Sequence, residues 1–141
     1  MMRIDFLPLV FLSALASCSC GDHCPASPRD VGIQIVTAAR QGVGGPDEMD
    51  TISGSISGAD SNDVKVLLYA HAGDRWWVQP YEDAPFTVVG SDRQWTARIH
   101  LGYEYAAFLV HRSYASPPKQ PMSLPEVHGC IWAVTVKPGR T

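Results

Sequence analysis

A few side chains have the chemistry for catalysis, and their spacing decides how far that chemistry can be taken. Glu82 and Glu104 are the two carboxylates that could act as the acid and base of a glycoside hydrolase, which needs paired carboxylates across a cleft. His71 and His111 would imitate a metal site with Asp74 if their strands were neighbours. Spacing along the chain supports neither set. We therefore expect no enzyme, no metal and no cofactor, with a small hydrolase as a distant alternative.

An apolar run at the N-terminus ends in small residues just before the first cysteine. Arg3 precedes the run, which spans residues 6–16, and its end reads Leu15-Ala16-Ser17-Cys18. A transmembrane helix needs about 20 apolar residues, so the run has the length of a cleaved signal instead. The segment resembles the lipobox of bacterial lipoproteins. That resemblance implies a signal peptide over residues 1–17 and an acylated Cys18 that anchors the chain in a membrane.

The same resemblance implies a location. Ser19, rather than aspartate, follows the acylated cysteine, a pattern that favours the outer membrane in a Gram-negative cell envelope. The alternative is an ordinary secretory signal that is cut elsewhere and leaves Cys18 unmodified.

Three further cysteines, Cys20, Cys24 and Cys130, would reach an oxidising compartment, where disulfides persist. A bond from Cys24 to Cys130 would close a loop of about 105 residues, for which the chain-entropy treatment gives roughly 4–5 kcal/mol. A bond from Cys20 to Cys24 would close a much smaller ring. Residues 18–24 also have the side chains of a metal site, although zinc sites usually draw ligands from two separated pairs. The pairing stays open at this point.

The charge and composition of the chain exclude several partners. Its 141 residues carry a net charge of −3, 18% of them are charged, and Lys and Arg form no cluster. Nucleic-acid binding depends on neutralising phosphates, so we expect no nucleic-acid partner. The sequence also has no phosphate-binding loop and no dinucleotide fingerprint. Its 12 glycines and 11 prolines favour short elements separated by turns.

Alternation of apolar residues predicts strands rather than helices. In the clearest case Val64, Val66, Leu68 and Ala70 share one face of a buried strand. Strands are expected at residues 31–35, 52–57, 64–71, 76–80, 86–89, 95–101, 105–111 and 131–136. Seven or eight short strands predict a single antiparallel β-sandwich over residues 31–141. Residues 18–30 would be a flexible tether between this domain and the membrane.

Residues 112–129 interrupt the strand pattern. Prolines at 117, 118, 121 and 125 cannot donate ladder hydrogen bonds, so they predict an extended excursion across the surface. A loop of this length in a small domain is often functional, and a plain crossover between the sheets is the alternative.

An aromatic stretch supplies the candidate binding residues. Trp76 and Trp77 are adjacent, so on a strand one should fill the core and the other should face outward. The outer indole, with Tyr81 and either Tyr103 or Tyr105, would form a platform on which a sugar ring can stack. Hydrogen bonds to the sugar hydroxyls would come from Gln79, Glu82 and Asp83. Alternatively, the proline-rich loop covers the outer tryptophan.

The segments Ile52 to Gly58, Val64 to Tyr69, Phe86 to Gly90 with Trp95, and Tyr105 to Val110 together resemble a known class. They look like the immunoglobulin-like accessory β-sandwiches of secreted bacterial proteins, which often accompany carbohydrate-active or adhesive domains. We expect a non-catalytic surface module that binds a glycan or an envelope protein through the aromatic patch and the loop. A purely structural envelope lipoprotein without a small ligand is the alternative.

Overall fold

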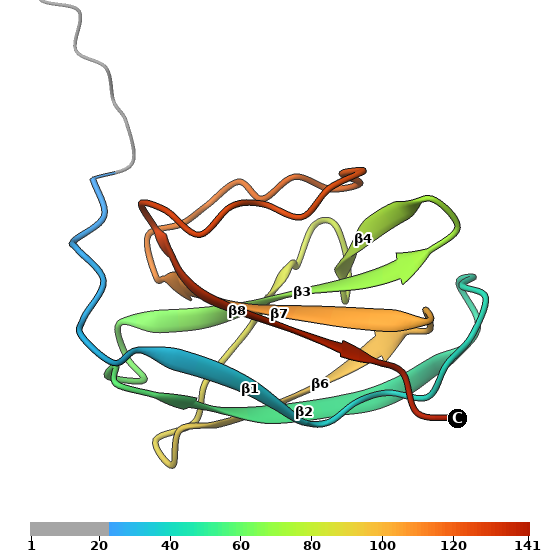
Figure 1. The fold of residues 1–141 in the computed structure, drawn as a ribbon, viewed down its shortest axis with the longest axis horizontal. Helices are drawn as coiled ribbons and strands as arrows, with labels where there is room; N and C mark the ends of the chain where they lie inside the picture. Colours follow the sequence, from blue (N-terminus) through green and yellow to red (C-terminus); the bar gives the residue numbers. More distant parts are fainter. Residues whose placement is uncertain (1–22) are drawn as a thin grey trace, which may run out of the picture.

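The computed structural model describes residues 23–141, which form eight β-strands and no helix (Figure 1). The strands are β1 (Gly32–Thr37), β2 (Met49–Ser57), β3 (Val64–Ala72), β4 (Arg75–Gln79), β5 (Phe86–Thr87), β6 (Gln94–His100), β7 (Glu104–His111) and β8 (Ile131–Pro138). Each lies where alternation predicted a strand, and β2 starts earlier than expected. These residues contain no helix that could cross a membrane. The lipobox and Cys18 lie outside the described residues.

The strands form two antiparallel sheets that face each other (Figure 1). One sheet has the order β1-β2-β6. The other has the order β4-β3-β7-β8, and the short β5 also pairs with β3. In the standard strand letters of immunoglobulin-like sandwiches, the first sheet corresponds to A-B-E and the second to C′-C-F-G. The predicted all-β fold is therefore confirmed.

Alternate residues of both sheets fill the space between them. On β6, Trp95 and Ile99 are buried in this core, whereas Thr96 and Arg98 face solvent. Trp132 of β8 packs into the same core from the opposite sheet. The buried residues of the core include few polar side chains, so apolar burial is the main force that holds the two sheets together.

Residues 112–129 add a third layer over the outer face of the β4-β3-β7-β8 sheet (Figure 1). Phe108 on that face packs edge-on against Tyr69, and Tyr114 and Leu124 of the loop pack against the same cluster. The Tyr69 hydroxyl donates a 2.7 Å hydrogen bond to the carbonyl of Pro118. This layer explains why β7 is apolar on both faces: its inner side faces the sandwich core and its outer side faces the loop.

The loop also covers the outer edge of β4. The backbone N–H of Trp76 donates to the carbonyl of Pro121, and that of Val78 donates to the carbonyl of Lys119, both at 3.0 Å. Prolines lack an N–H but keep their carbonyls, so a proline-rich segment can still accept from an edge strand. The edge that would otherwise offer unpaired donors is thereby closed.

Tyr105 is buried, although the sequence offered it as one of two candidates for the exposed aromatic platform. Its side chain is fully buried at the start of β7, and its hydroxyl donates to the carbonyl of Arg40 at 2.6 Å. The same hydroxyl accepts from the N–H of Gly102 at 3.0 Å. A tyrosine at this corner that bonds the backbone just upstream is the tyrosine corner of immunoglobulin-like sandwiches. Burial raises the pKa of Tyr105.

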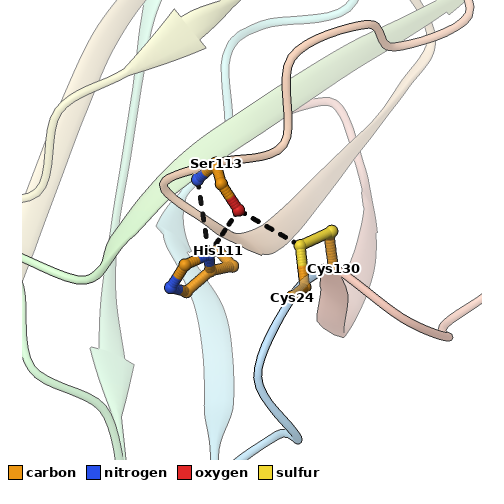
Figure 2. The surroundings of a disulfide bond; sticks show 4 residues. All are labelled: Cys24, His111, Ser113 and Cys130. Carbon is orange, nitrogen blue, oxygen red and sulfur yellow. Dashed lines mark hydrogen bonds between the residues drawn. A yellow bond between two sulfur atoms is a disulfide. The ribbon is translucent and has the colours of Figure 1, made fainter. Parts of the chain in front are cut away.

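A disulfide joins Cys24 to Cys130 across 106 positions of sequence (Figure 2). Cys130 immediately precedes β8, and its carbonyl accepts a 2.8 Å hydrogen bond from the N–H of His111 at the end of β7. The Ser113 hydroxyl lies 3.2 Å from the Cys24 sulfur and 2.7 Å from Nδ1 of His111. The bond therefore fixes the entering chain to the end of the β7-β8 pair, which is the longer of the two pairings that the sequence left open.

Candidate binding groove

A groove of about 600 Å³ lies at the end of the sandwich opposite the disulfide. It forms because β4 extends the larger sheet beyond β6, the edge strand of the smaller sheet, and leaves part of its inner face without a facing strand. Ala70, Ala72 and Leu101 form the apolar floor. Residues 43–46 form one wall, and the chain from Trp77 to Glu82 forms the other.

The two adjacent tryptophans face opposite sides of β4, as the sequence predicted. Trp76 is 7% exposed and lies under the loop layer, where its ring stacks on His71 with centroids 4.5 Å apart. Trp77 is 39% exposed and lines the groove, and its indole N–H donates to the carbonyl of Ala72 at 3.1 Å. Trp76 does not line the groove, because the loop covers its side chain. Trp77 remains open to a ligand.

Gln79 lines the groove but is only 3% exposed, and its amide is occupied by the chain itself. Its Oε1 accepts the backbone N–H of His100 at 2.9 Å and lies 3.1 Å from Nδ1 of the same residue. An amide oxygen can only accept, so Nδ1 of His100 carries the hydrogen of this contact. Gln79 thus orients the His100 ring in the groove, and its amide oxygen is already used within the chain.

Tyr81 and Glu82 form the rim beyond β4, directly after a cis peptide bond between Gln79 and Pro80. Tyr81 is half exposed, and its ring meets the His100 ring edge-on with centroids 5.7 Å apart. The Oε1 atom of Glu82 accepts a 2.8 Å hydrogen bond from the amide of Gln120. Trp77, Tyr81 and His100 therefore present three rings to one groove.

The opposite wall, residues 43–46, is held by hydrogen bonds on both sides. Before it, the N–H groups of Gln41 and Gly42 donate to the carbonyls of Arg140 and Gly102 at 2.8 and 3.0 Å. After it, Asp50 Oδ2 accepts from the Arg140 guanidinium at 2.9 Å. Backbone N–H groups, that of Arg40 first, and the nearby Arg140 hold the pKa of Asp50 below its usual range.

The catalytic sets considered from the sequence do not assemble. Glu82 lines the groove, whereas Glu104 bonds Nδ1 of His71 at 2.8 Å and does not line it. His71 and His111 are not neighbours, because the antiparallel register pairs His71 with Glu104 at one end of β3 and His111 with Val64 at the other. Within residues 23–141, no three metal-ligating side chains gather at one place.

Several residues that line the groove carry no signal in the sequence. Val43 to Pro46 read as an ordinary glycine-rich turn, and His100 reads as a solvent-facing residue of a half-wet strand. They meet Trp77 only because of how the two sheets are offset. Gly44 and Gly45 have positive φ angles, which favour glycine, so the glycine-rich sequence of this turn is the one local feature that indicates the shape of this wall.

Comparison with known proteins gave no match: no family model, curated protein or solved structure matches this chain. The function is therefore inferred from the groove and from the N-terminal sequence.

Proposed function

We propose that this protein is a lipid-anchored, non-catalytic binding module of the bacterial cell envelope, and that it binds a glycan or an envelope protein in the groove beside Trp77 and Tyr81. The observation that carries the proposal is the half-exposed pair of rings over a preformed apolar floor. Ligand sites in proteins are mostly apolar hollows with a few oriented polar groups, and this groove has that composition.

The position of the disulfide supports a ligand site that faces away from the membrane. Cys130 lies beside His111, which pairs with Val64 at the start of β3, whereas Ala70 and Ala72 at the end of β3 line the groove. At about 3.3 Å per residue, these two ends of β3 are about 25 Å apart. In Figure 1 the first described residues lie at the left end of the sandwich, and the β3-β4 turn lies at the right. A chain anchored through Cys18 would therefore hold the groove at its far end.

The anchor is tested by replacing Cys18. We expect Cys18→Ala to move the protein from the membrane fraction to the soluble fraction and to abolish incorporation of labelled fatty acid, because the acylated residue is removed. Cys20→Ser is the matched control, since it removes a neighbouring thiol and leaves the lipobox intact. A Cys18→Ala protein that stays in the membrane and still takes up label would overturn the anchor.

The groove is tested through the fluorescence of Trp77, the one exposed indole of the four tryptophans. We expect a titration of the full acylated protein in detergent, with peptidoglycan fragments, oligosaccharides and solubilised envelope proteins, to identify a ligand that protects Trp77 from iodide quenching. Trp77→Ala should weaken its binding at least about tenfold, or about 1.4 kcal/mol. Val36→Ala, an exposed apolar truncation on β1 outside the groove, should have no effect. If no titrant protects the indole, the binding function is wrong and the alternative, a structural envelope lipoprotein without a small ligand, is correct.

A further inference from the structure

The charged side chains at the groove are mostly of one sign. Glu82 is the only carboxylate that lines it, and no Lys or Arg does so within the described residues. Three more carboxylates, those of Asp47, Asp74 and Asp83, directly follow lining residues in the chain and are exposed. The nearby cations are Lys119, at 3.7 Å from Glu82, and Arg75, at 3.8 Å from Asp74. Both pairs are exposed, so solvent screens them and leaves them easily exchanged.

The aromatic rings of the groove, like its carboxylates, favour a positively charged ligand. The faces of indole and phenol rings attract ammonium and guanidinium groups, most strongly where the cation is partly desolvated. Trp77, Tyr81 and Glu82 come from one short stretch of the chain and all line the groove. A cation bound at Glu82 would therefore lie in the same groove as these two aromatic rings.

A cation alone would leave most of the groove empty. Its floor and far wall are aliphatic, formed by Val43, Pro46, Ala70, Ala72 and Leu101. A volume of about 600 Å³ corresponds to roughly twenty water molecules at about 30 Å³ each, far more than one ammonium group displaces. The occupant must therefore bring apolar groups as well as positive charge.

The polar groups of the groove do not suit a densely hydroxylated ligand. The indole N–H of Trp77 and the amide of Gln79 are already bonded within the chain. A sugar with many hydroxyls would lose its water there and would find mainly Glu82 and the Tyr81 hydroxyl as side-chain partners in return.

Given the proposed binding function, on which this step rests, we infer that the groove binds an extended segment of a partner polypeptide in which a Lys or Arg lies beside apolar side chains. Alternating side chains of such a segment place the cation at Glu82 and the apolar groups on the floor. Of the two ligand classes in the proposed function, a glycan and an envelope protein, this inference selects the envelope protein.

The inference is tested with three blocked pentapeptides of one length and apolar content. They are acetyl-Leu-Lys-Leu-Lys-Leu-amide, the same peptide with Gln in place of Lys, and the same peptide with Glu in place of Lys. With the full acylated protein in detergent, we expect the Lys peptide to bind about tenfold more tightly than the Gln peptide and the Glu peptide to bind least. Raising the salt concentration from 0.05 to 0.5 M should narrow this difference, because partly exposed charges are screened.

Variants locate the binding. Glu82→Gln should weaken the Lys peptide about three- to tenfold and leave the Gln peptide unchanged, whereas Trp77→Ala should weaken both. Glu126→Gln removes the same charge from an exposed carboxylate outside the groove and should change neither affinity. Unchanged circular dichroism and Tm in Glu82→Gln would show that the loss is local, since Glu82 also contacts Gln120.

Three outcomes would overturn the inference. Equal affinity for the Lys and Glu peptides would remove the charge requirement. Competition by tetramethylammonium at concentrations equal to those of the Lys peptide would indicate a small-cation site. Binding of an oligosaccharide at Trp77 with no peptide bound would leave the proposed function standing and replace the polypeptide by a glycan. If neither peptides nor glycans nor envelope proteins protect Trp77, the proposed function fails as well.

Discussion

Replacement of both Cys24 and Cys130 by serine should lower the free energy of unfolding by about 4–5 kcal/mol, because the bond closes a loop of more than 100 residues in the unfolded chain. Such a loss is a large part of the stability of a domain of this size. It should lower the Tm by at least about 10 °C. Urea unfolding and calorimetry of the variant, in a Cys20→Ser background that prevents exchange of partners, measure both quantities.

The control separates the covalent bond from its surroundings. Ser113→Ala removes the hydroxyl that lies between the Cys24 sulfur and His111 but keeps the disulfide, so it should cost about 1 kcal/mol or less. Adding reductant to the wild-type protein should reproduce the instability of the double variant. Equal stability of the oxidised wild type and the double variant would contradict the prediction.

Truncation of two neighbouring tryptophans should have very different effects on stability. Trp76→Ala should lower the free energy of unfolding by about 3–5 kcal/mol, since it opens a cavity between the sheet and the loop layer. Trp77→Ala should cost only about 1 kcal/mol, because the indole is partly exposed and loses one hydrogen bond, to Ala72. Denaturant unfolding of the two variants gives the comparison.

Limited proteolysis provides a second measurement that distinguishes Trp76→Ala from Trp77→Ala. The loop of residues 112–129 packs against the cluster that contains Trp76, so Trp76→Ala should make this loop a cleavage site, while Trp77→Ala should not. A similar loss of stability in both variants, with equal cleavage, would mean that the loop is not the layer that buries Trp76.

Much of this fold could be predicted because the deciding information is local. In a strand with one solvent-exposed face, apolar and polar residues alternate along the chain. The alternation over residues 95–101 predicted β6 by this rule, and Trp95 and Ile99 lie on its buried face. The pattern over residues 105–111 likewise predicted the strand β7. The adjacency of Trp76 and Trp77 predicted opposite orientations, because side chains alternate across a strand.

Other parts depended on which segments meet, and local patterning does not contain that information. Tyr105 has an aromatic ring that suits a surface platform equally well, and only its place at the start of β7 buries it. His71 and His111 were separated by the register of β3 and β7, since a paired strand fixes every cross-strand neighbour at once. The proline-rich loop became a third layer because an apolar sheet face and an open strand edge lie beneath it.

The sequence by itself determined the strands, the sandwich class, the resemblance to a lipoprotein and the opposed tryptophans, all of which follow from residue order over a few positions. The tertiary structure alone decided which tryptophan is exposed, which cysteines pair, and that Val43 to Pro46 and His100 join Trp77 and Tyr81 in one groove. The physical reason is the offset between the two sheets. It leaves part of an inner sheet face without a partner, and such an offset is set by long-range packing that no short stretch of the chain encodes.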